Sequence, residues 1–514
     1  MQQKSAIRYT TLLHCALYLY CVAVLLLYFA IGDNRLVNIY TVTLDVAMVA
    51  ALSLMVAVPH KRSAEVRVAF ASFAALFMLP GVPGYMLYPV NFPFGGMDWA
   101  RVAVDDVNRA LVFIVFGILA ALGGFIAGSY VAAFVPRAER ATPAPISARR
   151  LALIGIAFVA LELYVGIRFS RFSTDVSTEE GAFYLMRLFS SDAVLIVCLV
   201  LLAYRWTLLR RSERMTLIAT AILIVVHKTL VGSRAGLFVL LMLFFVIMLD
   251  RFGDFRLSRR AVTIVFVAAA GTLIAFPVAT IVRDYWLLSS RVSYRLSLAE
   301  FWRDRAAGEG GHDPTPLLRS FFARLNGLDP VATIATGHSR DYEQYVSLTN
   351  DVKSFINIIT PGTPFPEALE RSKTFAIVYR GYPEVYLQNT YVTWMWTIWG
   401  DCYGLFGFSG GLLWMLFLCA LFSAGFAVLA RIRLRGSTYV RVSYLFFTYT
   451  FVTSFGLDTF AADMVYYLLP LFVVLALAGE FTSYMFLPFR YLSTGGAYLA
   501  RHVTGRVRLR IVPR

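Results

Sequence analysis

Twelve runs of mostly apolar residues, each near twenty residues long, follow one another along the chain with polar segments between them. A helix that crosses the hydrocarbon core of a bilayer, about 30 Å thick, needs about twenty such residues because each adds about 1.5 Å. The pattern therefore predicts twelve membrane-spanning helices. They lie near residues 11–31, 38–58, 66–82, 111–134, 151–168, 191–208, 215–231, 235–250, 261–283, 404–430, 440–457 and 463–487.

The polar interval from Asp284 to Gln388 is much longer than any other between two runs. Loops of this length are usually functional or disordered, and the many aromatic and aliphatic residues here argue against disorder. Inside the interval, apolar residues recur at spacings of three and four. This spacing predicts an amphipathic helix that lies on the membrane or packs on the bundle. Its apolar residues are Leu318, Phe321, Phe322, Leu325 and Leu328.

The predicted fold is an all-α polytopic membrane protein with one large loop before the tenth span. Residues 1–283 hold nine spans, residues 284–403 form the long loop, residues 404–487 hold three further spans, and residues 488–514 form a basic tail. The first run exceeds the core of a signal peptide and lacks a small-residue cleavage site, so it is predicted to be a retained helix.

Composition agrees with this fold and indicates its topology. Hydrophobic residues make up 59% of the chain and charged residues 15%, whereas soluble proteins carry about 25% charged residues. By the positive-inside rule, the basic polar segments and both termini are cytoplasmic, and the long loop is extracytoplasmic. The net charge of +16 is then explained without a nucleic-acid partner. The five cysteines show neither a disulfide framework nor a zinc spacing. The basic segments are 61–62, 137–150, 210–214, 251–260, 431–435 and the tail.

A group of basic residues ends the seventh span and follows it, in the sequence HisLysThrLeuValGlySerArg at 227–234. The topology places Lys228 and Arg234 at the extracytoplasmic membrane surface, around a tight turn that Gly232 permits. A guanidinium binds phosphate oxygens through paired donors, so these cations suit a lipid diphosphate at headgroup level. The alternative is that both side chains reach the interface only as anchors.

Three further arginines are predicted on the same side of the membrane. Arg283 closes the ninth span, and Arg319 and Arg324 lie on the predicted amphipathic helix. If the apolar face of that helix rests on the membrane or the bundle, its arginines can point at the headgroup layer. The alternative is a solvated polar face.

Candidate general bases lie among the extracytoplasmic carboxylates and histidines. Burial among aromatic residues raises the pKa of a carboxyl group towards the working range of a base, and Glu384 and Asp401 best fit that setting. His338 is a further candidate. For each of the three, a purely structural or solvated role is the alternative. Weaker candidates are Asp341, Glu343, His312 and the pair Asp105 and Asp106, which could also bind a metal, although a helix cap is the simpler interpretation.

Asp45, Glu162 and Glu480 lie within or near the ends of spans, where ionisable groups are costly and invite a functional role. The alternative is that they neutralise Lys or Arg partners. They do not form the connected series that a proton pathway would need. No Walker, Rossmann, HisGluXxxXxxHis or GlyXxxSerXxxGly motif is present, so ATPase, redox and hydrolase functions have no motif here.

Three short motifs carry a resemblance to a known family. They are the GlySerArg turn at 232–234, the sequence ArgLeuAsnGlyLeuAsp at 324–329 in the long loop, and GlyAspCysTyrGlyLeuPheGlyPheSerGlyGly at 400–411, which enters the next span. With the layout of the spans, they resemble bacterial Wzy-type O-antigen and exopolysaccharide polymerases, which are akin to the O-antigen ligases. The resemblance covers most of the chain as architecture.

The resemblance implies a glycosyltransferase of the bacterial inner membrane that works on the periplasmic face. Donor and acceptor would both be glycans linked to undecaprenyl diphosphate. The lipid diphosphate is itself the activated leaving group, so no cofactor and no metal is expected. The five basic residues named above would bind the donor diphosphate, and one of the three candidate bases would activate the acceptor hydroxyl. Expected partners are the lipid bilayer, a flippase and a chain-length regulator, with no nucleic acid.

Three other functions stay open on the sequence alone. An O-antigen ligase shares the donor and the layout but passes the glycan to lipid A core. A glycosyltransferase that uses polyprenyl-phosphate sugars would carry acids in its first outer loop, where Asp33 is the sole acid here. A transporter or flippase would show paired halves and helices broken at mid-membrane. The long polar loop and the short first outer loop favour the enzyme.

Overall fold

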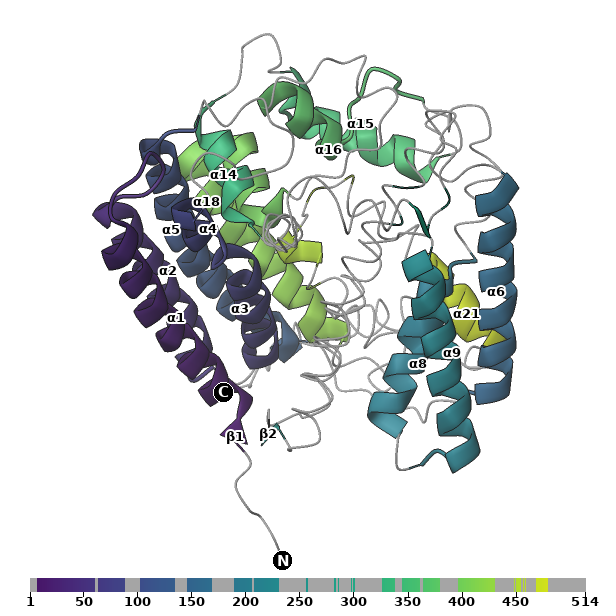
Figure 1. Ribbon diagram of the computed structural model, residues 1–514. Coiled ribbons are helices and arrows are strands. Elements are labelled where there is room, and N and C mark those ends of the chain that lie inside the picture. The colour runs from purple at the N-terminus through teal and green to yellow at the C-terminus, as the bar shows by residue number, and fades with distance from the viewer. Residues whose placement is uncertain are drawn as a thin grey trace, which may run out of the picture.

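Figure 1 shows the computed structural model of the chain, in which the described elements are helices apart from one short strand pair. The structure describes residues 7–60, 63–87, 102–134, 146–168, 189–205, 208–230, 256–257, 326–337, 344–360, 364–379, 396–429 and 468–478, together with 282, 285, 297, 299–300, 448, 450–453, 456 and 458. The strand pair joins β1 (Ile7–Arg8) to β2 (Arg256–Leu257) in antiparallel register.

Apart from the short helices within residues 348–379, the described helices fall into two groups that lie on opposite sides of the molecule in Figure 1. The first group contains α1 (Tyr9–Ile31), α2 (Ile39–Ala57), α3 (Ala64–Met78), α4 (Gly81–Leu87), α5 (Val104–Ser129), the 3₁₀ turn η2 (Tyr130–Phe134), α14 (Leu328–Ala335) and α18 (Thr397–Leu429). The second contains α6 (Ala148–Arg168), α8 (Ser191–Arg205), α9 (Arg211–Leu230) and α21 (Leu469–Ala478).

Five helical stretches in the described part of the chain are long and apolar enough to cross a membrane. They are Thr10–Ile31, Ile39–Ala57, Val66–Leu87, Val104–Ser129 and Thr397–Val428. The all-α prediction is therefore confirmed, and these five stretches coincide with the first four predicted spans and the tenth.

The other predicted spans have different outcomes. Those at 151–168, 191–208 and 215–231 coincide with α6, α8 and α9, which are helical but are not among the five. Only the central part of the predicted span at 463–487 is described, as α21. The spans at 235–250, 261–283 and 440–457 lie almost wholly outside the described residues, so the number twelve stays a prediction.

The closest helix pair is α5 with α18, and glycines on α5 allow the approach. An ideal Cβ built at Gly124 would lie 2.4 Å from the carbonyl oxygen of Leu416, and one at Gly128 would lie 2.0 Å from that of Ala420. Any side chain at either position would overlap with backbone. Small residues are the usual means by which membrane helices come this close, since no hydrophobic effect drives them together in lipid. The Ser423 hydroxyl adds a hydrogen bond to the Phe125 carbonyl at 2.8 Å.

Helix α18 begins at Thr397 rather than near residue 404, and it is broken once. Gly407 has φ 66° and ψ −163°, a conformation that is open essentially to glycine alone. Residues 408–429 are by themselves long enough to cross the hydrocarbon core, for which about twenty suffice. Residues 397–406 of α18, which include Asp401, are therefore not needed for the crossing and can lie at headgroup level.

The motif at 324–329 attaches the long loop to the first helix group. Its described part, Asn326 to Asp329, caps and begins α14: the Asn326 side chain accepts the backbone N–H of Asp329 at 3.2 Å. The backbone N–H of Gly327 donates to the Phe77 carbonyl at 2.7 Å, and Tyr85 donates its hydroxyl proton to the Asp329 carboxylate at 3.1 Å. The whole of α14 is buried. This part of the long loop is thus an integral part of the bundle.

Candidate functional site

Two asparagines hold the middle of the long loop together. Asn350 and Asn357 lie on the same face of α15 (Leu348–Ile359), two turns apart. The Asn350 side chain donates to the Leu369 carbonyl at 2.9 Å and accepts the Leu369 N–H at 3.1 Å. Asn357 makes the same pair of bonds with Phe365, at 2.7 and 2.9 Å. The segment 365–369 is therefore bound along α15, which fixes where the next helix, α16 (Arg371–Thr374), begins.

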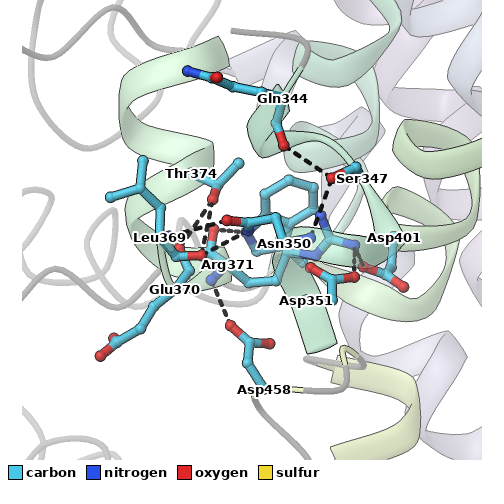
Figure 2. Close-up of polar contacts among 11 residues, drawn as sticks. Gln344, Ser347, Asn350, Asp351, Leu369, Glu370, Arg371, Thr374, Asp401 and Asp458 are labelled. Carbon is cyan, nitrogen blue, oxygen red and sulfur yellow. Dashed lines mark hydrogen bonds and ion pairs between the residues drawn. The ribbon is translucent and has the colours of Figure 1, made fainter. Parts of the chain in front are cut away.

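Arg371, the first residue of α16, is the centre of a buried charge cluster (Figure 2). Its Nη2 atom lies 2.5 Å from Oδ2 of Asp351 on α15 and 2.8 Å from Oδ1 of Asp401 on α18. Its backbone N–H donates to Oδ2 of Asp458 at 2.5 Å. All four side chains are almost fully buried. The cluster joins α15 and α16 to the beginning of α18, although its members are far apart in sequence.

Aromatic residues enclose the guanidinium. Trp396, just before α18, donates its indole N–H to the Arg371 carbonyl at 2.7 Å, and its ring lies 5.0 Å from the guanidinium carbon. Phe375 and Tyr379 form the π-helical turn η5 (Phe375–Tyr379) and pack edge-on against Trp396. A cation over an aromatic face is stabilised by the ring quadrupole, most strongly where water is absent. The cluster is therefore a dry site in which charges interact strongly.

The cluster holds more acid than base. Two carboxyl groups contact the guanidinium and a third accepts the backbone N–H of the same arginine, and in a buried site like charges suppress one another's ionisation. Burial raises the pKa of Asp351 to about 8; Arg371 opposes the shift, while Asp401 and Asp458 add to it. Burial lowers the pKa of Arg371, but the carboxylates more than offset this, so its pKa is raised. Burial therefore favours the protonated form of Asp351, while Arg371 stays charged.

The hydrogen-bonding capacity of the cluster is incompletely used. Nε and Nη1 of Arg371 and Oδ1 of Asp351 have no hydrogen-bond partner among the described residues. The contact of Asp401 Oδ1 with Arg371 is an ion pair whose alignment is not that of a hydrogen bond. Buried polar atoms without partners cost free energy, and a functional role is one reason why a protein retains them.

Of the residues chosen from the sequence, the structure brings Asp401 into this cluster. Lys228 lies in a second cluster, described next. The remaining candidates lie outside the described residues: Glu384, His338, Arg234, Arg283, Arg324 and Arg319, together with the weaker candidates Asp341, Glu343 and His312. Their roles stay predictions.

Lys228 is neutralised by two carboxylates where α6, α8 and α9 meet. Its Nζ atom lies 3.2 Å from Oε2 of Glu162 and 3.0 Å from Oδ2 of Asp192. Nε2 of His227 lies 2.8 Å from the same oxygen of Glu162, and the Ser191 N–H and hydroxyl both donate to that carboxylate at 2.8 Å. The interpretation of Glu162 as the neutralising partner of a cation is thus confirmed. Lys228 reaches a diphosphate only if one of these contacts opens.

The other acids singled out from the sequence have local roles. Asp106 lies in the first turn of α5 and accepts the Ala103 N–H at 3.0 Å, which confirms the helix-cap interpretation for this residue. Asp45 on α2 contacts the Tyr20 hydroxyl of α1 at 2.7 Å. Within the part of the chain that the structure describes, no group of three or more His, Cys, Asp and Glu could hold a metal ion. Glu480 lies outside that part.

Sequence reasoning missed Arg371, Asp351 and Asp458. One signal was present: on α15, the polar residues Asn350, Asp351 and Ser354 recur at helical spacing and share a face. A polar face opposite an apolar one is ordinarily assigned to solvent, whereas here the polar face is the buried one.

The fold and the cluster define a helical protein with helices suited to a membrane and a buried acid-rich centre in its long loop. Comparisons of the chain with protein-family models, curated proteins and solved structures found no match.

Proposed function

We propose that this protein is a glycosyltransferase that polymerises oligosaccharide repeat units linked to undecaprenyl diphosphate, on the extracytoplasmic face of the inner membrane. The observation that carries the proposal is the buried cluster of Asp351, Arg371 and Asp401. It fastens the long loop to the beginning of α18, and it holds the buried Asp401 carboxylate beside a single arginine. A carboxylate that is buried and held in place in this way is a typical general base.

In the proposed reaction, the acceptor hydroxyl oxygen attacks the anomeric carbon of the donor glycan. The bond from that carbon to the diphosphate oxygen breaks, and undecaprenyl diphosphate leaves with the electron pair. The hydroxyl proton passes to a carboxylate. The bond that forms is the glycosidic link between donor and acceptor, so the chain grows by one transfer and no oxidant or nucleotide takes part.

Asp401 is the proposed base, and Arg371 is its positioning residue. Burial favours the protonated form of Asp351, so the Arg371 guanidinium lies beside Asp401 with less competition from this second carboxyl group. The break at Gly407 supports this role, because it allows Asp401 to lie at headgroup level, where a lipid diphosphate lies. Arg234, Arg283 and Arg324 remain the proposed ligands of the donor diphosphate, and their charge would stabilise the leaving group. Lys228 and Arg319 are proposed as helpers, and Glu384 and His338 as alternative bases.

The test is a polymerisation assay with the full chain in lipid nanodiscs and undecaprenyl-diphosphate-linked repeat units. The expected product is a ladder of lipid-linked oligomers on a gel. Asp401→Asn should reduce the ladder by at least about 100-fold, the usual share of a general base. The matched control is Glu367→Gln, which alters an exposed carboxylate of the same loop. If the protein makes no ladder, the polymerase proposal is wrong. Glycan appearing on added lipid A core would instead identify a ligase.

A transporter is the second candidate, and two observations favour it. Helix α18 is broken at Gly407, and discontinuous helices are typical of transport sites. The buried cluster of Glu162, Asp192 and Lys228 lies between helices of the second group, where ionisable residues often mark a pathway. Movement of the lipid-linked glycan across a sealed vesicle, without a ladder, would establish transport.

A further inference from the structure

The polarity of α15 is reversed relative to a helix on the surface of a soluble protein. Its buried face carries Asn350, Asp351 and Ser354. Its opposite face carries an apolar stripe, which consists of Leu348, Val352, Phe355 and Ile359. In this stripe Leu348 is 41% exposed, Val352 43% and Ile359 46%, and Phe355 is half-buried. A stripe at spacings of four, three and four residues forms one continuous face of a helix.

Contacts made by the polar face of α15 fix the orientation of the helix, so it cannot turn over to hide its stripe. Asn350 and Asn357 hold the backbone of Leu369 and Phe365 by four hydrogen bonds, and the Asp351 carboxylate contacts Arg371. Rotation of α15 would break all of these contacts and leave buried charges unpaired. The apolar stripe is therefore a fixed surface of the protein.

The contact of Asp351 with Arg371 also indicates where α15 lies along the axis of the long helices. Asp351 and Asp401 contact the same Nη2 atom of Arg371, so α15 lies beside the first turns of α18. Those turns precede Gly407 and are not needed to cross the hydrocarbon core. Figure 1 shows α15 running across the direction of the long helices, at the end of the molecule where α18 begins. An amphipathic helix in this position and orientation is typical of the membrane interface.

The charge beside the stripe is already balanced. Lys353 and Glu367 form an ion pair at 2.8 Å, and both side chains are partly exposed. This pair offers lipid headgroups no net charge, so the attraction argued for this face rests on its apolar area.

We infer that the apolar stripe of α15 is inserted at the boundary of headgroups and acyl chains in the bilayer leaflet next to the long loop. It would anchor the Arg371 cluster at a fixed depth. The inference goes beyond the proposed glycosyl transfer and does not depend on it, because it concerns where the loop rests and not what it catalyses.

The test places one nitroxide spin label at a time on the full chain in phosphatidylcholine nanodiscs, in a Cys15→Ala background that removes the exposed native thiol. The label is attached at Val352→Cys. Two references come from the same protein: Leu413→Cys on α18, 71% exposed and predicted to face lipid, and Glu367→Cys, whose side chain is 59% exposed beside the polar flank of α15. Collision rates with oxygen, which concentrates in lipid, and with a water-soluble nickel chelate are measured for each.

For each label, the collision rate with oxygen is divided by that with the nickel chelate. We expect this ratio to be at least about threefold higher for the label at Val352 than for the label at Glu367. The ratio at Val352 should resemble that at Leu413. A label that resembles Glu367 would place the stripe in water and overturn the inference. Low collision with both reagents would mean that protein covers the stripe, which also overturns it. If the oxygen preference appears only after undecaprenyl diphosphate is added, the lipid tail of that substrate covers the stripe instead of the bilayer, and the inference is wrong. A thermal unfolding midpoint within about 2 °C of the unlabelled protein checks the fold of each variant.

Discussion

Asp351 and Asp401 contact one and the same atom, Nη2 of Arg371, at 2.5 and 2.8 Å. One carboxylate belongs to α15 in the long loop and the other to α18 in the bundle, so a single guanidinium nitrogen joins the two parts. A buried charge whose partner is removed is costly, whereas replacing the whole set by apolar groups is not. The stability of this junction therefore depends on the balance of charge and not on any one residue.

Removal of the cation alone is expected to be severe. Arg371→Met should lower the free energy of unfolding by about 3–5 kcal/mol, because it leaves the surrounding carboxylates uncompensated in a dry site. Thermal unfolding in detergent, followed by far-ultraviolet circular dichroism, measures this. The matched control is Lys353→Met, which breaks the partly exposed pair with Glu367 and should change little. Adding Asp401→Asn to Arg371→Met should recover part of the loss, because it removes a carboxylate that contacts the guanidinium; no recovery would show that the carboxylates are not the cause.

The protonation of Asp351 predicts a pH dependence of stability. Its pKa is raised by burial from an ordinary value near 3.9 to about 8, so between these values the folded state binds a proton that the unfolded state has released. Stability contributed by this proton is fully present below about pH 4 and is lost as the pH rises through about 8. The unfolding midpoint should therefore fall between pH 5 and pH 8 more steeply in the native chain than in Asp351→Asn. Parallel curves for the two proteins would contradict the prediction.

The close approach of α5 and α18 leaves no room for a larger side chain at the α5 glycines that face α18. Gly128→Ala places a Cβ within 2.0 Å of the Ala420 carbonyl oxygen, so the two helices must separate, at a cost of about 1–3 kcal/mol. Gly123→Ala on the same helix is the control, because its Cβ meets nothing nearer than 3.9 Å. Unfolding midpoints of the two variants should differ by several degrees. Equal midpoints would show that the helices are not this close.

The backbone conformation at the break in α18 predicts that only glycine fits at position 407 without strain. Gly407→Ala forces an L side chain into a conformation at φ 66° and ψ −163°, which should cost about 1–3 kcal/mol even though space for a methyl group is present. Gly425→Ala, in an unstrained part of the same helix with equal space, should be neutral or slightly stabilising. If the two substitutions have equal effects on the unfolding midpoint, α18 is continuous through residue 407.

The apolar pattern was sufficient to predict most of the first helix group. The runs at 11–31, 38–58 and 66–82 coincide with described helices because the requirement of the bilayer is local and can be counted along the sequence. Asp401 was also found, because aromatic residues flank it in the sequence. The beginning of α18 was not, because the seven-residue segment before 404 is helical through packing on α14 and α5, which no local pattern reveals.

The Arg371 cluster could not be predicted, because its members have no common local signal. Arg371 finds its partners 20 residues before it in Asp351 and 87 residues after it in Asp458. Spacings of this kind come from tertiary folding and correspond to no helical or strand period. The sequence analysis left open, as one of two alternatives, that Glu162 neutralises a cation, and it did not indicate that the cation is Lys228.

The two asparagines of α15 hold the segment 365–369 by main-chain atoms only. Every residue except proline presents the same N–H and carbonyl groups, so this attachment does not depend on the side chains at Pro366, Glu367 and Ala368. The course of the chain leading to Arg371 is therefore fixed while its composition is free to change. This makes the segment a suitable place to introduce reporter groups beside the charge cluster without disturbing it.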